Sequence, residues 1–331
     1  MSKQQRTYQC RLSVGPLEDV LLAKYASLFN KAERALFGKL QAGGDLTDLK
    51  GEFLQEFRIT ARQFNGMSAQ LKGKIASIKE RRLGIIEEAQ QRIARAKKVL
   101  KKIHDPAKHH QKKRRIATLQ GRLARVKEDH ASGRVRLCFG SRKLFRAQFE
   151  IEANGYASHS EWLRDWQAAR ASQFFVIGSR DETAGCQSCV GRIGQDGSIS
   201  LRLRLPGALW EYGRYLSLSG IRLQCGHEAI VAAMGRNLSA DKQLWQAVNY
   251  RFVKDNKGWR VFVTVAMPEV PIRSHKDTGV IGIDINADNL AVTETDRFGN
   301  PLKYFSLPCI TYGKTAEQRR ERLSKMPWSW S

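Results

Sequence analysis

Two apolar stripes separated by a proline constrain the fold of this chain more than any other feature. Apolar residues recur every three or four positions over 71–103, and a shorter stripe covers 116–126. This spacing is typical of helices with one apolar face. Asp105 and Pro106 interrupt it, because proline disfavours helical geometry in the residue before it. Two helices joined at this break can pack their stripes together, so the sequence predicts an antiparallel coiled-coil hairpin over 68–131.

The same hairpin carries a large excess of positive charge. Residues 71–134 contain 20 lysines or arginines against 6 acids, a net +14 within a whole-chain charge of +25. Solvated surfaces usually mix both signs, whereas one-signed clusters are typical of proteins that bind phosphates. A plain solvated helix face is the alternative. We expect phosphate contacts from the basic runs on both sides of the turn, namely Lys97, Lys98, Lys101, Lys102, Lys112, Lys113, Arg114 and Arg115.

Strand-like patterns surround the helical part of the chain. Residues 6–14 alternate between apolar and polar, and helical spacing follows over 17–58. After Gly133 the period returns to two, first over 134–139 and most strictly over 199–205. Several short strands separated by turn residues predict a small antiparallel barrel or sandwich. The first strand is expected to join it, which makes the helices an insertion.

These patterns predict an α+β protein with several domains. A first barrel strand over 1–16 precedes a basic helical recognition lobe over 17–132, and the rest of a small antiparallel β-barrel covers 133–270. A polar linker leads to a last domain over 277–331. With 331 residues, of which 42% are hydrophobic, the chain can bury more than one core.

Neither a secretory signal nor a membrane span is expected. The first residues are polar, and no window approaches the roughly 18 consecutive apolar residues that a spanning helix needs. Six scattered cysteines are too few for a disulfide scaffold. We therefore expect a reduced, cytoplasmic protein without a membrane partner.

The last part of the sequence contains the motif that indicates chemistry. An apolar strand with Val280, Ile281 and Ile283 leads to Asp284, and two more strands are expected over 290–293 and 302–305. A buried strand that ends in an exposed aspartate is typical of the opening of an RNase H-type fold. In that fold the aspartate shares two metal ions with carboxylates supplied later, and the metals promote phosphodiester hydrolysis.

The element Gly282-Ile-Asp284-Ile-Asn286, placed after a strand-rich region with a basic helical insertion, resembles the transposon-encoded TnpB (OrfB) nucleases and the related type V CRISPR effectors. The order of the parts matches over nearly the whole chain, while only the Asp284 motif is locally specific. A sugar kinase or actin-like fold is the alternative for a Gly-x-Asp strand by itself. The resemblance implies an RNA-guided DNA endonuclease with a RuvC-like domain, with guide RNA and target DNA as partners and Mg²⁺ at Asp284.

The sequence departs from this family in its catalytic residues. The family pattern needs a later Glu and a later Asp, with a four-cysteine zinc element between them, and this sequence ends 47 residues after Asp284. Asp288, Glu294 and Asp296 fit a turn and a strand end. We therefore expect a truncated TnpB-like protein that binds nucleic acid without a complete catalytic site. Half of a split active nuclease, or a guide-independent DNA- or RNA-binding repressor, are the alternatives.

Two further sets of residues receive no functional role. Cys186 and Cys189 have metal-ligand spacing, but Cys225 and His227 are a poor second pair, so zinc is not expected. Five tryptophans could stack on bases. Aromatic residues in strands more often belong to the core, and none of the following is assigned: Trp162, Trp166, Trp210, Trp245 and Trp259.

Overall fold

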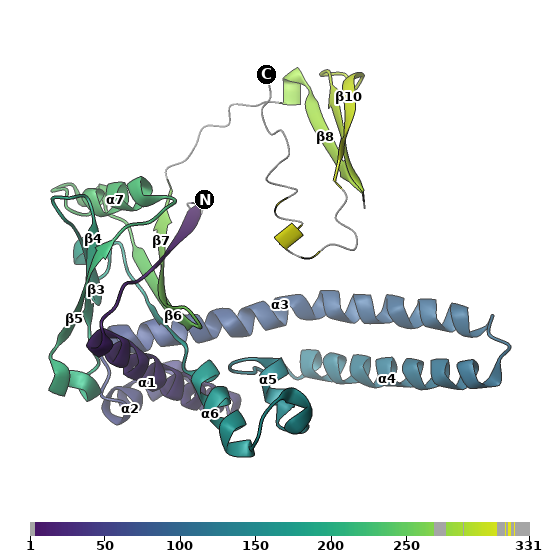
Figure 1. Ribbon diagram of the computed structural model, residues 1–331, viewed down its shortest axis with the longest axis horizontal. Helices are drawn as coiled ribbons and strands as arrows, with labels where there is room; N and C mark the ends of the chain where they lie inside the picture. The colour runs from purple at the N-terminus through teal and green to yellow at the C-terminus, as the bar shows by residue number, and fades with distance from the viewer. Residues whose placement is uncertain are drawn as a thin grey trace. The chain divides into compact units, whose positions relative to one another are not determined.

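The computed structural model describes residues 4–267, 276–286, 288–309, 315, 317–318 and 321. The chain divides into two compact units, Met1–Pro268 and Glu269–Ser331. Both contain antiparallel sheets, and the first unit also contains the long helices (Figure 1). The mixed α and β composition expected from the sequence is confirmed.

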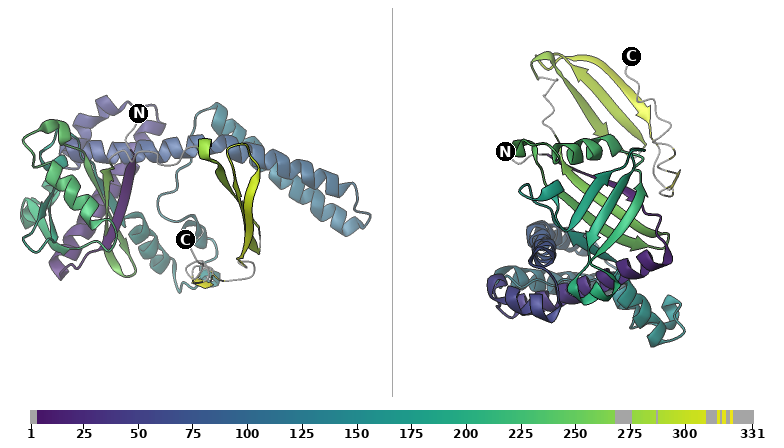
Figure 2. Two further views of the ribbon diagram at one scale, coloured as in Figure 1. Left: turned by 90° about the horizontal axis from the view of Figure 1, so that it is seen from above. Right: turned by 90° about the vertical axis from the view of Figure 1, so that its left-hand side faces the viewer.

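A hairpin of two long helices is the largest element of the first unit. Helix α3 (Ala61–Leu100) and helix α4 (Pro106–Ala131) run side by side and project from the sheets as an arm in Figures 1 and 2. Thr60 and Gln63 form a capping box at the start of α3. The Asp105 side chain accepts a hydrogen bond from the Lys108 amide at 2.9 Å, with proline in the first turn. The Asp105–Pro106 break therefore starts the return helix.

The contact between the two helices is apolar only in the outer half of the hairpin. Ile93, Ala96 and Ile116 are buried there, and Leu100, Leu119 and Leu123 pack against them. In the inner half the charged residues Arg82 and Asp129 are buried, while Ile85 is 48% exposed. Ile85 is one of the apolar residues of 71–103 that were expected to face the other helix. That expectation is wrong, because Arg82 takes the inward position one turn earlier. Its guanidinium donates to the carbonyl oxygens of Asp129 and Arg134.

The first strand pairs with a strand from the end of the first unit. Strand β1 (Gln5–Arg11) lies antiparallel to β7 (Gly258–Ala266), with Tyr8 opposite Val263. Next come β6 (Val248–Asp255) and β2 (Gln173–Val176), which complete a four-stranded sheet in the order β1-β7-β6-β2. The expectation that β1 joins the later strands is confirmed. All residues between β1 and β2 are thus an insertion between the two edge strands of one sheet.

A second antiparallel sheet contains β3 (Cys189–Ile193), β4 (Ile199–Arg204) and β5 (Tyr215–Ile221). Among the described residues no ladder joins it to the first sheet, so the closed barrel expected from the sequence is wrong. The two sheets share one hydrophobic core, in the manner of a sandwich. They approach closely at Gly191, where a Cβ would lie 3.0 Å from the Tyr250 hydroxyl oxygen. Alternation predicts an inward face, but it does not determine which strands pair.

Helices cover this core on the side of the insertion. Helix α1 (Pro16–Gln41) and the start of α3 pack on β2, and α2 (Leu46–Glu56) packs on both helices. Tyr25 stacks on Phe174 with ring centroids 4.1 Å apart, and Phe174 stacks on Phe252 at 4.8 Å. Three aromatic rings thereby connect α1 to two strands. On the other side of the first unit, α7 (His227–Arg236) packs on β3 and β7.

Short helices and turns complete the first unit. The segment 134–139 was expected to be a strand but has no regular structure, and α5 (Arg142–Ala147) and α6 (His159–Arg170) follow it. Trp162 and Trp166 of α6 pack on Ala147 in a small core of their own. The remaining 3₁₀ helices of the unit are η1 (Glu152–Asn154), η2 (Thr183–Gly185), η3 (Gly207–Tyr212) and η4 (Lys242–Leu244).

The second unit contains a three-stranded antiparallel sheet. After η5 (Lys276–Thr278), the strands β8 (Val280–Ile285), β9 (Asn289–Thr295) and β10 (Pro301–Pro308) are joined in sequence order. The sequence predicts a buried β8, yet Ile281 is 53% and Ile283 is 59% exposed. That expectation is wrong for the described residues. A sheet face is buried only by a second layer, and the described part of this unit supplies none over β8.

Candidate nucleic-acid interface

The basic residues predicted from the sequence lie in the outer part of the hairpin. They occupy the last turn of α3, the connecting turn and the first turns of α4 (Figure 1). Seven of the eight are exposed, and Lys112 is half-buried. Within the described residues none forms an ion pair with a carboxylate. These side chains, called the tip cluster below, are therefore open to an outside anion: Lys97, Lys98, Lys101, Lys102, Lys112, Lys113, Arg114 and Arg115.

A second basic site, at the base of the hairpin, is a groove of about 1370 Å³. It lies between the inner half of α3 and α4 and the segment that contains α5 and α6 (Figure 1). Two acids, Glu88 and Asp129, line it together with ten arginines, and no lysine does. The ten arginines of this arginine groove are Arg34, Arg81, Arg82, Arg92, Arg122, Arg125, Arg136, Arg142, Arg146 and Arg170.

Both acids of the groove already have partners. Glu88 pairs with Arg92 at 2.7 Å along α3, and Asp129 pairs with Arg136 at 2.8 Å. Arg82 is bonded to backbone carbonyls. In the part of the chain that the structure describes, the other seven arginines have no carboxylate partner. The groove is therefore an uncompensated field of guanidinium groups, whose planar donors match phosphate oxygens well.

Arg34 and Arg170 form the most constrained part of the groove. A buried guanidinium nitrogen of each, Nη1 of Arg34 and Nε of Arg170, has no hydrogen-bond partner in the described structure. Burial, and then the positive charge of Arg170, lower the pKa of Arg34. Glu33 beside it is fully buried and paired with Lys74 at 2.7 Å. A buried donor without a partner costs free energy, and a bound anion would remove that cost.

Sequence reasoning missed this groove for an identifiable reason. Arg81, Arg82 and Arg92 all belong to α3, but Arg34 and Arg170 come from α1 and α6. Nothing in the local pattern brings those two helices to the hairpin. The one sequence signal is the preference for arginine over lysine in 114–146, a range that contains five of the ten arginines lining the groove.

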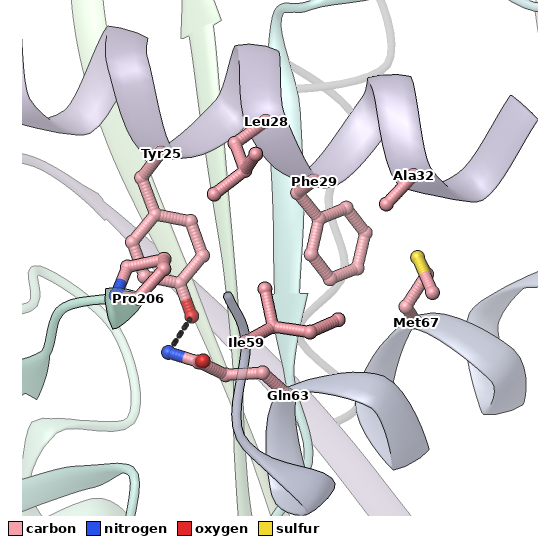
Figure 3. A pocket seen from close by; sticks show the side chains of 8 residues that line it. All are labelled: Tyr25, Leu28, Phe29, Ala32, Ile59, Gln63, Met67 and Pro206. Atoms are coloured by element: carbon pink, nitrogen blue, oxygen red, sulfur yellow. Dashed lines mark hydrogen bonds between the residues drawn. The ribbon is translucent and has the colours of Figure 1, made fainter. Parts of the chain in front are cut away.

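An enclosed pocket beside α1 is part of the core. Figure 3 shows its lining side chains from α1, from the start of α3 and at Pro206, with the Gln63 amide donating to the Tyr25 hydroxyl at 3.2 Å. The cavity measures about 10 Å³. That is about the volume that one water occupies, so it is a packing gap and no ligand site.

Asp284 lies exposed on β8 in the second unit. The Asn286 amide donates to its carboxylate at 3.4 Å. Asp284 is opposite Ala291 in the ladder, whereas Glu294 is opposite Ile281. Successive residues of a strand point to opposite faces, so Asp284 and Glu294 lie on different faces of the sheet. Asp296 is held in the next turn, where its carboxylate accepts from the amides of Phe298 and Asn300.

The described residues of the second unit do not fit a two-metal site. No group of three His, Cys, Asp or Glu side chains in the described part of the chain could hold a metal ion. A site for two Mg²⁺ ions needs several carboxylates on one surface. On the sheet face that carries Asp284, the strands β8 and β9 present no second carboxylate. No hydrolytic step is derived from this arrangement.

The paired cysteines belong to the core. Cys186 and Cys189 are fully buried, and burial raises the pKa of Cys186 to about 12 and that of Cys189 well above its ordinary value. Cys225 is exposed. The ring nitrogens of His227 contact the carbonyl oxygen of Gly197 and the amide of Leu223. The Cys186 and Cys189 side chains both pack within the shared core of the two sheets.

Comparison with known proteins leaves the family open. Neither protein-family models nor curated proteins match the chain. The described helices include none with an apolar run long enough to span a bilayer. The basic surfaces of the first unit are therefore the features that bear most directly on function.

Proposed function

We propose that the first unit binds the sugar–phosphate backbone of nucleic acid through the arginine groove and the tip cluster. The observation that carries this proposal is the composition of the groove: ten arginines and two acids line it, and eight of these arginines have no carboxylate partner among the described residues. Arginines that neutralise the phosphates of a nucleic acid release the cations condensed on it, and this release drives binding at low salt. Arginine also binds phosphate oxygens with two parallel hydrogen bonds.

We further propose that the chain is a TnpB-like protein whose partners are a guide RNA and its target DNA. The pairing of β1 with β7 supports this, because it places the basic helices as an insertion within one sheet. The exposed Asp284 on a strand of an antiparallel meander also supports it. In this proposal the second unit is the start of a RuvC-like domain, and Asp284 is the first carboxylate for Mg²⁺. Activity by this chain alone is not proposed.

The binding proposal is tested with a charge-matched pair of variants. Arg122 and Arg146 line the groove and are exposed, so the double variant Arg122→Gln/Arg146→Gln should fold normally. Its matched control is Arg164→Gln/Arg222→Gln, which removes the same charge from exposed positions outside the groove. Fluorescence anisotropy with a labelled duplex, repeated over a series of salt concentrations, gives affinity and salt slope.

We expect the groove variant to bind more weakly and to reduce the salt slope by about 1 for each lost phosphate contact. The control variant should bind with nearly the same affinity and salt slope as the unmodified protein. Equal effects from the two double variants would mean that only net charge matters, and the groove would lose its role.

The proposal that the protein binds a guide RNA is tested by identifying the nucleic acid that co-purifies with it. Purification after nuclease treatment should retain a protected RNA of defined sequence if the TnpB-like proposal is right. A heterogeneous mixture would favour a guide-independent binding protein. Cleavage of plasmid in Mg²⁺ that disappears in Asp284→Ala would show instead that the chain, or an assembly of it, is an active nuclease.

A further inference from the structure

Three aromatic side chains lie exposed on the first unit, outside the arginine groove. Trp210 and Tyr212 belong to η3, and Tyr215 begins β5. Their exposed fractions are 41%, 41% and 43%. Large aromatic residues usually bury more of their surface. Trp259, Trp162 and Trp166 do so, being no more than 8% exposed. The exposure of three aromatic residues so close together in the sequence therefore needs an explanation.

Each of the three rings has a cation over it. Lys24 Nζ lies 4.2 Å from the centre of the Tyr212 ring, Arg202 Cζ 4.3 Å from Tyr215, and Arg214 Cζ 5.0 Å from Trp210. Arg204 is opposite Tyr215 in the ladder. We call these seven residues the cation–aromatic patch: Lys24, Arg202, Arg204, Trp210, Tyr212, Arg214 and Tyr215.

The register of the second sheet explains why these residues point outward. Leu203 and Leu205 are fully buried, so Arg202 and Arg204, which alternate with them, lie on the outer face. The indole nitrogen of Trp210 donates to the Leu205 carbonyl at 3.2 Å, and Leu209 anchors η3 in the core. The rings are thus held in place by the fold and are not loose surface side chains.

The charges of the patch are not balanced by acids. Within the described residues Arg202, Arg204 and Arg214 form no ion pair with a carboxylate. Glu211 is the one acid between positions 199 and 221, and it is exposed. Cations stacked on aromatic rings can be a plain surface arrangement. Three such pairs on rings that are close in sequence, with Glu211 as the one acid among them, favour an outside ligand that is both flat and anionic.

We propose that the cation–aromatic patch binds unpaired nucleotides of a single-stranded polynucleotide. Its rings would stack on bases and its guanidinium groups would contact bases or phosphates, as in many single-strand binding surfaces. Bases inside a duplex are already stacked on each other and cannot offer their faces to a ring. The inference rests on the proposed function only in that the ligand is a polynucleotide, because none of these residues lines the arginine groove.

The test separates base stacking from phosphate binding. The double variant Trp210→Leu/Tyr215→Leu removes two rings and keeps apolar side chains, while Trp210→Phe/Tyr215→Phe keeps both rings. Binding of labelled oligo(U), oligo(dT) and an abasic oligodeoxynucleotide of equal length is measured for each. Thermal unfolding followed by circular dichroism checks that the variants fold.

We expect the leucine variant to lose about tenfold or more in affinity for at least one base-containing strand. Binding of the abasic strand should not change, and the phenylalanine variant should restore most of the loss. A loss of affinity confined to oligo(U) would show that the patch binds RNA, and a loss confined to oligo(dT) that it binds DNA. A loss of affinity for both strands would show that it binds single-stranded RNA and DNA alike.

Equal losses on abasic and base-containing strands, or no loss at all, would overturn the proposal. Arg122→Gln/Arg146→Gln serves as a second control. If the arginine groove binds phosphates, this variant should lose affinity for all three strands to a similar extent. Failure of the patch proposal and failure of the groove proposal therefore give different results.

Discussion

Arg34 on α1 and Arg170 at the end of α6 interact although they are far apart in the sequence. Burial, and then the positive charge of Arg170, lower the pKa of Arg34. Each also keeps a buried guanidinium nitrogen without a partner. Like charges held together destabilise a fold unless something compensates them. This arrangement agrees with the proposal that the arginine groove binds an anion, at the expense of the stability of the free protein.

Replacement of Arg34 should therefore raise stability and weaken binding together. Arg34→Met keeps an apolar stem and removes both the repulsion and the unpaired donor, so we expect about 1 kcal/mol more free energy of unfolding. Affinity for nucleic acid should fall several-fold. Urea unfolding and anisotropy measure the two effects, with the exposed Arg164→Met as control. A less stable Arg34→Met with unchanged affinity would contradict a ligand-binding role.

The tip cluster should contribute to binding without contributing to the fold. Replacement of Lys97, Lys98, Lys101 and Lys102 by glutamine removes four exposed charges that have no carboxylate partner. We expect weaker binding and a shallower salt slope, by up to about 0.9 for each lost contact. The melting temperature should stay close to that of the unmodified protein. Unchanged affinity at low salt would mean that the outer hairpin is only a solvated surface.

Arg82 should be essential for the inner half of the hairpin. Its guanidinium is 5% exposed and donates to carbonyl oxygens at and beyond the end of α4. Arg82→Met leaves those acceptors unpaired, so we expect a loss of about 2 kcal/mol in unfolding free energy. Amides near the end of α4 should exchange faster with deuterium. The neighbouring Arg81→Met, which changes an exposed side chain, should have a much smaller effect on both measurements.

Acid should destabilise the contact between α1 and the first sheet. The hydrogen bond from Lys254, followed by that from the Trp259 indole, lowers the pKa of Asp19 below its ordinary value of 3.8. A carboxylate whose pKa is lower in the folded protein contributes stability above pH 3.8, and this stability is lost as the pH falls toward the folded value. We expect Asp19→Asn to be less stable at pH 7 and to lose less stability below pH 4. Asp165→Asn is the control for urea unfolding across this range.

Thiol labelling should separate the cysteines by burial. Cys225 is exposed, whereas burial raises the pKa of Cys186 to about 12. Only the thiolate reacts, so a maleimide at pH 7 should modify Cys225 and leave Cys186 and Cys189 intact until urea unfolds the protein. Mass spectrometry of peptides identifies the sites. Rapid modification of Cys189 under native conditions would show that its surroundings open, contrary to the packing described above.

Much of the fold follows from short-range patterns. The proline break at Asp105 and the apolar spacing of α3 and α4 predict the hairpin, because helical periodicity is a local property of the chain. Strict alternation over 199–205 predicts a strand with its leucines inward, and the structure has β4 there. The positions of the tip cluster are likewise determined by the sequence alone, since charge and proximity to a turn do not depend on distant residues.

Tertiary structure decided what depends on contacts between distant segments. Ile85 and Trp210 are apolar in sequence but exposed, whereas Arg82 is charged but buried. In each case, packing against other elements determined which side chain points inward. The two sheets remain open although their strands alternate as in a barrel. Arg34 and Arg170 meet only because α1 and α6 are both brought to the base of the hairpin. The sequence by itself determined the periodic elements and their charge; the pairing of strands and the arginine groove arose from the summed packing of the whole unit, which no local pattern encodes.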